Sequence, residues 1–217
     1  LPNIEYVHGI DSLMYNNIYS VMNHLGNPKF GFTKENILNL KKEDIEGYDI
    51  VIHLAAIVGA PACKNNVEQS KLVNEDGTKH LVGLCGSTQH FVYLMTNSGY
   101  GQTDGMFECV ETDKLNPVSE YGTQKCNGEN YVLEHPFSIS LRLGTVFGVS
   151  SRMRFDLMVN DFVKKFYNIK LSLKSIHVLD VWKEFRLYQP DYLRNFVHID
   201  DVCDAIILSI NRKLNGI

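Results

Sequence analysis

Short apolar runs alternate with longer amphipathic segments along this chain. The runs are rich in β-branched and aromatic residues and are bounded by turn residues, which is typical of strands. They predict strands at Ile4–Ile10, Phe30–Phe32, Asp49–Leu54, Phe91–Met95, Ser138–Leu143 and Phe196–Ile199. The segments between them have helical periodicity and predict helices at about Tyr15–Leu25, Lys41–Gly47, Asn66–Cys85, Ser119–Leu133, Phe155–Phe166 and Val202–Ile210.

This alternation predicts an α/β fold with a doubly wound parallel sheet. The run Asp49–Leu54 is apolar throughout, which indicates a central parallel strand buried on both faces. Ligands of such sheets bind beyond the carboxyl ends of the strands. Asp11, the loop after Leu54 and Thr96 all fall at strand ends, so we expect them to converge on one crevice.

The loop after Leu54 is made of small residues, including Ala55, Ala56 and Gly59. Small residues allow a flat cofactor to approach the backbone closely. They equally allow close packing between a strand and a helix. The sequence by itself leaves both interpretations open.

The composition is that of an ordinary globular protein. The chain has 217 residues, of which 44% are hydrophobic and 21% are charged, enough for one domain or slightly more. The net charge of −4 gives no electrostatic reason to expect nucleic acid or an anionic membrane as a partner. No apolar run is long enough to span a bilayer, and the first residues show no signal peptide.

The cysteines and histidines show no metal-ligand spacing. The five cysteines are odd in number, lie far apart and include no Cys-x-x-Cys pair. This pattern favours reduced thiols in a cytoplasmic protein over a disulfide framework or a zinc site. We therefore expect no bound metal.

Three residues between Met95 and Lys125 have the chemistry of a proton-transfer site. Thr96 ends a predicted strand, and Tyr121 and Lys125 are four residues apart on a predicted helix, so that both project from one face. A tyrosine has a pKa near 10, and a nearby lysine charge lowers it by favouring the phenolate. Tyr121 could then exchange a proton with an alcohol or ketone, with Thr96 bonded to the same oxygen. The alternative for this spacing is a solvated helix face.

Several motifs together resemble those of extended short-chain dehydrogenases/reductases of the nucleotide-sugar epimerase/dehydratase group. They appear in that family's order and spacing from about Ile4 to the end of the chain. The motifs are Asp49-Ile-Val-Ile-His-Leu-Ala-Ala56, Asn74 with Gly77-Thr78, Thr96-Asn-Ser-Gly-Tyr-Gly101, Tyr121-Gly-Thr-Gln-Lys125, Leu141-Arg-Leu-Gly-Thr-Val-Phe-Gly148 and Arg194-Asn-Phe-Val-His-Ile-Asp-Asp201.

The resemblance implies NAD as the cofactor. Asp11 matches the acidic residue that holds the adenosine ribose and repels the 2′-phosphate of NADP, although it also suits a helix N-cap. The resemblance implies a catalytic role for Thr96, Tyr121 and Lys125. Tyr121 and Lys125 also contact the cofactor, and the remaining implied cofactor residues are Asn36, Ile37, Leu54, Ala55, Ala56 and Asn74.

The substrate side is implied to be a nucleotide sugar. Arg194 resembles an arginine that pairs with the substrate diphosphate, and Asn160 resembles a helix-borne asparagine at the same group. The alternatives are a surface arginine and a capping asparagine. Asn97 and Ser98 follow the catalytic hydroxyl, where we assign them to substrate contact.

The chain departs from the family pattern at its front. No Gly-x-x-Gly-x-x-Gly turn is present, and the chain starts at what resembles the second strand of the family. We therefore expect a Rossmann-like sheet lacking the first βα unit, of roughly 30 residues, with two strand edges unpaired. Residues 1–150 are assigned to this NAD-binding domain. Residues 151–217 form a partial C-terminal substrate lobe, with a strand and helix returning to the Rossmann domain.

The residues after Thr96 indicate which reaction the family resemblance implies. Dehydratases of the family carry Asp-Glu there, whereas this chain has Asn97-Ser98, which are not general acids or bases near pH 7. The expected function is therefore an NAD-dependent nucleotide-sugar epimerase. The alternatives are a carbonyl reductase acting on a non-nucleotide substrate and a non-catalytic nucleotide-binding member. Relatives commonly pair through the helices matching Asn66–Cys85 and Ser119–Leu133, which implies a homodimer.

Overall fold

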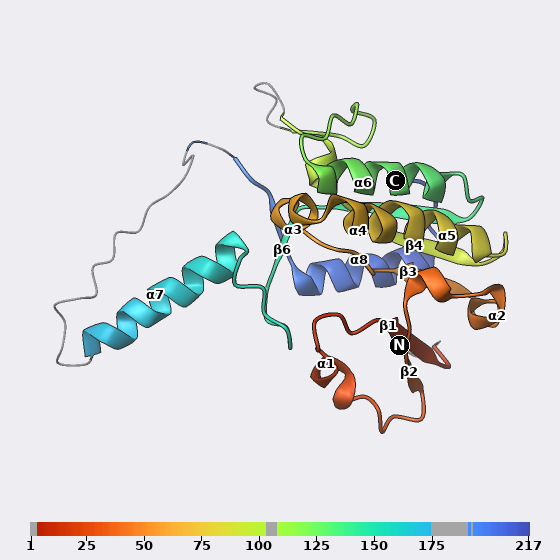
Figure 1. Ribbon diagram of the computed structural model, residues 1–217, viewed down its shortest axis with the longest axis horizontal. Coiled ribbons are helices and arrows are strands. Elements are labelled where there is room, and N and C mark those ends of the chain that lie inside the picture. Colours follow the sequence, from red (N-terminus) through yellow and green to blue (C-terminus); the bar gives the residue numbers. More distant parts are fainter. Residues whose placement is uncertain (1–3, 103–107, 175–190, 192) are drawn as a thin grey trace. The chain divides into compact units, whose positions relative to one another are not determined.

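The computed structural model describes residues 4–102, 108–174, 191 and 193–217 (Figure 1). The chain divides into two compact units. The first contains residues Leu1–Leu143 together with Cys203–Ile217, and the second contains Gly144–Val202. Each unit is described by itself below.

The first unit contains two separate parallel sheets. Strands β1 (Val7–Asp11) and β2 (Phe30–Lys34) pair with each other. Strands β3 (Ile50–His53), β4 (His90–Thr96) and β5 (Ser138–Leu143) form the other sheet in the order β3-β4-β5. All the strand pairs are parallel, which confirms the predicted α/β class with parallel strands.

Helical segments connect these strands. In the first unit they are α1 (Tyr19–Met22), η1 (Ile37–Asn39), α2 (Lys42–Ile45), α3 (Ala60–Asn65), α4 (Val67–Lys71), the π-helical η2 (Leu72–Asp76), α5 (Gly77–Leu84), η3 (Asn97–Gly99) and α6 (Glu120–Leu133). The second unit contains β6 (Thr145–Phe147), paired with β7 (Phe196–His198), and α7 (Met158–Lys174). Helix α8 (Ile199–Arg212) begins in the second unit and continues into the first.

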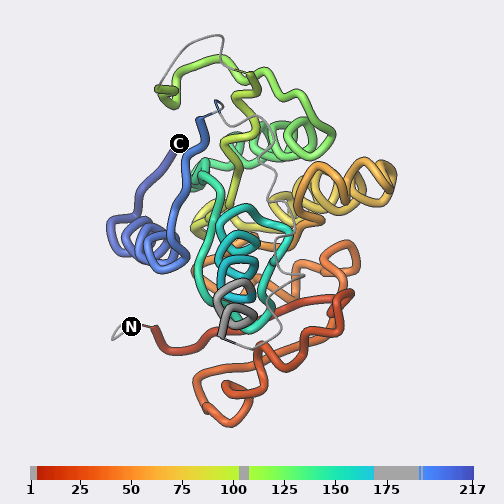
Figure 2. The backbone as a smooth tube through the Cα atoms, turned by 90° about the vertical axis from the view of Figure 1, so that its left-hand side faces the viewer, coloured from red at the N-terminus to blue at the C-terminus, as the bar shows by residue number. Residues whose placement is uncertain are grey.

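The core of the first unit forms around β4. Phe91, Tyr93 and Met95 alternate along this strand, so they share one face and are buried together with Cys126 and Val132 of α6. Helix α6 lies alongside the helical stretch from α4 to α5 in both backbone views (Figures 1 and 2). This packing brings the predicted catalytic helix against the strand that ends at Thr96.

Strand β3 differs from its prediction as a central strand buried on both faces. It forms one edge of its sheet, and among the described residues no strand pairs with its outer side. Ile52 is 41% exposed and Leu54, just after the strand, is 63% exposed. The open edges of β1 and β3 agree with the expected Rossmann-like sheet that lacks its first strand.

Two other local predictions need correction. The helix predicted over about Tyr15–Leu25 is only the four-residue α1, which buries none of its residues. Leu13 and Asn16, within the range predicted to be helical or just ahead of it, have positive φ values of 55° and 53°, and a short helix without a packed face gains little stability. The loop of small residues predicted after Leu54 ends at Gly59, because helix α3 begins at Ala60, with Pro61 in its first turn.

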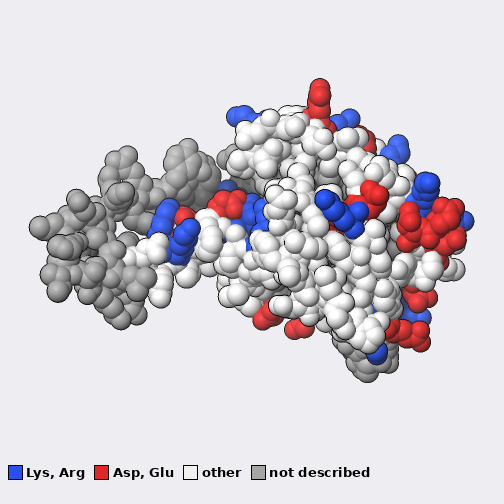
Figure 3. Space-filling view, turned by 60° about the horizontal axis from the view of Figure 1, so that its bottom comes forward, with Lys and Arg blue, Asp and Glu red and all other residues white. Residues whose placement is uncertain are grey.

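Charged side chains on the face shown in Figure 3 are mixed in sign, with Lys and Arg lying among Asp and Glu. No helix among the described residues has both the length and the apolar character needed to cross a bilayer. Most of the stretch between Asn168 and Tyr192 lies outside the described residues, which omit 175–190 and 192.

Candidate active site

Thr96 occupies the carboxyl end of β4, where the strand gives way to η3. Its side-chain oxygen accepts a hydrogen bond from the backbone N–H of Ser98 at 3.2 Å and lies 3.2 Å from the Ser98 hydroxyl oxygen. The threonine thus caps the turn that follows the strand. Its hydroxyl group is held at the strand end, where ligands of parallel sheets bind.

Helix α6 starts directly against this turn. Ser119 caps the helix by accepting a hydrogen bond from the Gly122 N–H at 3.1 Å. A side-chain carbon at Gly122 would lie 3.0 Å from the carbonyl oxygen of Ser98, so the glycine permits this close approach. Tyr121 therefore enters the helix beside the Thr96 turn, with Lys125 one turn later.

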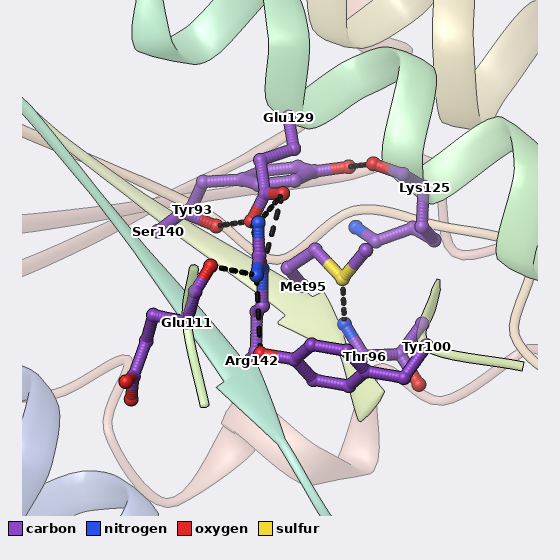
Figure 4. A network of polar contacts seen from close by, with 9 residues as sticks. All are labelled: Tyr93, Met95, Thr96, Tyr100, Glu111, Lys125, Glu129, Ser140 and Arg142. Carbon is purple, nitrogen blue, oxygen red and sulfur yellow. Dashed lines mark hydrogen bonds and ion pairs between the residues drawn. The ribbon is translucent and has the colours of Figure 1, made fainter. Parts of the chain in front are cut away.

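Lys125 is almost completely buried, with only 3% of its surface exposed. Its ammonium nitrogen lies 3.9 Å from the centre of the Tyr93 ring. The Tyr93 hydroxyl donates a hydrogen bond to the Lys125 carbonyl oxygen at 3.3 Å (Figure 4). Burial lowers the pKa of Lys125 to about 7, while the Glu129 carboxylate opposes that change.

A buried ion pair lies one turn further along α6. Arg142 of β5 donates three hydrogen bonds to the Glu129 carboxylate, at 2.7, 3.0 and 3.2 Å, and Ser140 donates another (Figure 4). Arg142 also donates to the Tyr100 hydroxyl at 3.0 Å and to the Glu111 carbonyl at 2.9 Å. The pair thereby connects α6, β5 and the loop after Thr96, and the hydrogen bonds that Arg142 donates to Glu129 raise the pKa of the arginine.

Asn74 connects the loop after β3 to helix α6. Its carbonyl oxygen accepts from the Ile57 N–H at 2.8 Å, and its amide donates to the Ile57 carbonyl at 2.9 Å and to Gln124 at 3.0 Å. Asn74 is fully buried within the π-helical turn η2, a feature that is frequent at functional sites. Because its side-chain amide is occupied by these protein groups, Asn74 holds the loop and α6 together.

His53 is a buried neutral side chain beneath the site. Thr78 donates its hydroxyl hydrogen to the Asn74 carbonyl, so it accepts from Nε2–H of His53 at 2.9 Å. Burial, with a smaller effect of the Lys125 charge, lowers the pKa of His53 to about 3. The imidazole is therefore uncharged at any physiological pH, and its ring centre lies 5.6 Å from that of Tyr93.

The remaining residues assigned to the cofactor lie in different environments. Asp11 is exposed at the end of β1 and accepts from the Leu13 N–H at 2.6 Å. Asn36 caps η1 by accepting from the Leu38 N–H at 3.0 Å. Ile37 is buried in the core. Leu54 is exposed and Ala55 and Ala56 are half-buried after β3.

The residues assigned to the substrate are divided between the two units. Asn97 and Ser98 follow Thr96 directly and belong to η3, the turn that Thr96 caps. Asn160 and Arg194 belong to the second unit. The Asn160 amide donates to the Arg154 carbonyl at 3.1 Å, and Arg194 is exposed before β7.

The described residues fit the nicotinamide side of NAD. The loop after β3 carries small, half-buried side chains at Ala55 and Ala56, and the hydrogen bonds of Asn74 to Ile57 fix its position. Lys125 and Tyr121 belong to the adjoining helix. Over the described ranges, no three His, Cys, Asp or Glu side chains come together as metal ligands.

Sequence reasoning missed the Glu129–Arg142 pair and the contacts between Tyr93 and Lys125. One signal was available: Arg142 stands between two leucines in a strand, and a charged residue in an apolar strand is rarely buried without a partner. Glu129 also lies four residues after Lys125 on the helix. Neither feature reveals from sequence which side chains meet.

The parallel strands, the threonine at a strand end and the Tyr–Lys helix define a Rossmann-like protein of the short-chain dehydrogenase/reductase type. The chain belongs to the NAD dependent epimerase/dehydratase family, whose model matches residues 2–216. This result confirms the family inferred from the motifs. It also identifies NAD as the cofactor on which that family of enzymes depends.

Known proteins of this type resemble the chain over most of its length. It is 33% identical, over 155 residues, to an uncharacterized UDP-glucose epimerase of Bacillus subtilis strain 168, covering 67% of this chain and 48% of that protein. The UDP-glucuronic acid 4-epimerase of Bacillus cereus, solved with UDP-glucuronic acid and NAD, is 24% identical with a TM-score of 0.80. That match covers 97% of this chain and 66% of the other.

A second solved structure shows the same fold. The UDP-N-acetylglucosamine 4-epimerase of Methanobrevibacter ruminantium M1, in complex with UDP-N-acetylmuramic acid, is 22% identical with a TM-score of 0.78. This match covers 97% of this chain and 66% of the other protein. The chain thus spans about half to two thirds of the length of these relatives.

Proposed function

We propose that this chain provides the catalytic residues of an NAD-dependent nucleotide-sugar epimerase. In this reaction a sugar hydroxyl is oxidised to a keto intermediate, which is then reduced again. The observation that carries the proposal is the arrangement of α6 against β4. There, a buried lysine follows Tyr121 by one helical turn, on a helix whose first turn packs against the turn that Thr96 caps.

The chain's own residues manage the proton of the sugar hydroxyl. Tyr121 accepts this proton as a phenolate during oxidation and returns it during reduction. The Lys125 ammonium favours the phenolate by its charge. Thr96 donates a hydrogen bond to the same oxygen. Bound NAD supplies the hydride chemistry and is regenerated over the cycle.

The residues after Thr96 favour epimerisation over dehydration. Elimination of water needs a further acid and base, whereas Asn97 and Ser98 carry an amide and a hydroxyl. The similar proteins include enzymes named for UDP-glucose and UDP-glucuronic acid, which supports a nucleotide-sugar substrate. In the second unit, the exposed guanidinium of Arg194 is suited to bind a diphosphate.

Replacing the phenol tests this proposal. Tyr121→Phe in the native protein should reduce epimerase turnover by at least about 10²-fold, because general acid–base catalysis contributes that much. Calorimetry should show unchanged NAD binding. Tyr131→Phe on the same helix is the matched control and should retain full turnover. Equal activity of the Tyr121 and Tyr131 variants would remove Tyr121 from the mechanism.

Competition separates this proposal from the two alternatives. Uridine diphosphate should inhibit a nucleotide-sugar enzyme, and Arg194→Met should weaken that inhibition. A carbonyl reductase for non-nucleotide substrates would be insensitive to both. Failure to bind NAD in calorimetry would support a non-catalytic member. We also propose a cytoplasmic homodimer that pairs through the helices carrying the exposed Val67 and Leu133.

A further inference from the structure

Tyr93 contacts both ends of Lys125. Its hydroxyl donates to the lysine carbonyl oxygen at 3.3 Å, and its ring lies beneath the ammonium nitrogen at 3.9 Å (Figure 4). Tyr93 is itself fully buried on β4, so neither contact is shared with solvent. One aromatic residue therefore connects the strand that carries Thr96 to the main chain and the side chain of the helix lysine.

A buried ammonium needs compensation for its lost hydration. The charged and titratable groups around Lys125 come from three elements. His53 of β3 is neutral, and the Glu129 carboxylate of α6 is engaged by Arg142 and Ser140. Tyr121 of α6 is the group whose proton must move. The Tyr93 ring of β4 lies against the ammonium, whose nitrogen is 3.9 Å from the ring centre. The face of an aromatic ring carries partial negative charge, so the ring can compensate the charge of the lysine.

We propose that Tyr93 is a positioning residue for Lys125: its ring holds the ammonium in the charged form, and its hydroxyl fixes the backbone of the same residue. This inference rests on the proposed function, in which a charged Lys125 favours the Tyr121 phenolate. It has a definite consequence for the protein itself. Because burial brings the pKa of Lys125 to about 7, loss of the ring should leave the lysine largely uncharged near neutral pH.

The test is to titrate Lys125 by NMR with ¹³C-labelled lysine side chains, assigning its signal with Lys125→Arg. Tyr93→Phe keeps the ring and should leave the Lys125 pKa nearly unchanged. Tyr93→Leu removes the ring and should lower this pKa by about one pH unit, a tenfold increase in the dissociation constant, as expected for a desolvated cation–π contact. Phe91→Leu is the matched control, since Phe91 is equally buried on the same strand.

A second series avoids any change in packing. In the Tyr93→Phe background, mono-, di- and trifluorophenylalanine at position 93 weaken the ring quadrupole while nearly keeping its shape. The Lys125 pKa should fall stepwise with fluorine content. The proposal is overturned if the trifluoro variant titrates like phenylalanine, or if Tyr93→Leu and Phe91→Leu shift Lys125 equally.

These measurements are independent of turnover. They need neither substrate nor NAD, so a stepwise response supports the role of Tyr93 even if Tyr121→Phe proves fully active. In an active native protein, the acidic limb of the pH–rate profile supplies the link to catalysis. Phe91→Leu should leave this limb in place. Trifluorophenylalanine at position 93 should shift the pH of this acidic limb relative to the Tyr93→Phe variant. An unchanged limb would contradict the catalytic part of the inference.

Discussion

Removing the Arg142 guanidinium is the most severe single test of the buried network. In Arg142→Met, the Glu129 carboxylate keeps its Ser140 hydrogen bond but loses the three from arginine. The Glu129 side chain is only 1% exposed and that of Arg142 only 8%, so water cannot replace the lost partner without rearrangement. Breaking such a pair on one side costs about 3–5 kcal/mol of unfolding free energy.

The upper half of that range applies here because Arg142 also bonds the Tyr100 hydroxyl and the Glu111 carbonyl, so the substitution releases the loop that follows Thr96. Methionine is the chosen replacement because it fills part of the volume and limits the cavity, so that the loss reports mainly the broken polar contacts. Lys79→Met is the control, because Lys79 is an exposed cation over the Tyr131 ring in the same unit, worth about 0.5–1 kcal/mol.

Urea unfolding followed by circular dichroism measures both variants. With a slope of about 1–3 kcal/mol per molar urea, the Arg142→Met midpoint should fall by at least about 1 M, and that of Lys79→Met by much less. The double variant Arg142→Met/Glu129→Gln should recover part of the loss, since it removes the unpaired charge. Equal midpoints for the two single variants, or a double variant less stable than Arg142→Met, would refute the reasoning.

Three further outcomes follow from the same geometry. Lys125 binds its proton in the unfolded chain up to a pKa near 10.5 but in the folded protein only to about 7, so its contribution to stability rises with pH between these values by up to about 1.4 kcal/mol per pH unit. Lys125→Met should remove that rise in urea unfolding at pH 7.5 and 9, whereas equal pH slopes in both proteins would contradict it. His53 has a folded pKa of about 3 against 6.5, so its contribution is lost as pH falls through this interval. His53→Phe should flatten the acid side of the stability profile, and an unchanged profile would show that His53 is not buried as described. Gly101→Ala should destabilise the protein by more than about 1 kcal/mol, because φ is +72° and the added carbon would overlap the Asn116 carbonyl, and a thermal midpoint equal to wild type would refute this.

The elements near the site were predictable because their signals are local. The strand ending at Thr96 is a continuous apolar run, and α6 starts at a serine cap two residues before Tyr121. Each depends on neighbouring residues alone. The motifs then supplied the family, which the match over residues 2–216 confirms.

The remaining features depend on partners far away in the sequence. Whether β3 lies at the centre or the edge of a sheet is decided by which strands pair with it, and its own apolar residues do not specify this. The stacking of Lys125 on Tyr93 joins residues 32 apart, and Arg142 meets Glu129 across a strand and a helix. Periodicity indicates which face of an element is buried, but it does not identify the side chain opposite.

The open side of β3 also affects how the polypeptide behaves in solution. An edge strand presents unpaired N–H and C=O groups that hydrogen-bond to any extended chain, and natural edges are often protected by lysine, proline or a bulge. The sequence of β3, Ile-Val-Ile-His, contains none of these residues. Concentrated samples of the 217-residue chain should therefore self-associate through intermolecular strand pairing, and a lysine in place of the exposed Ile52 should keep them dispersed.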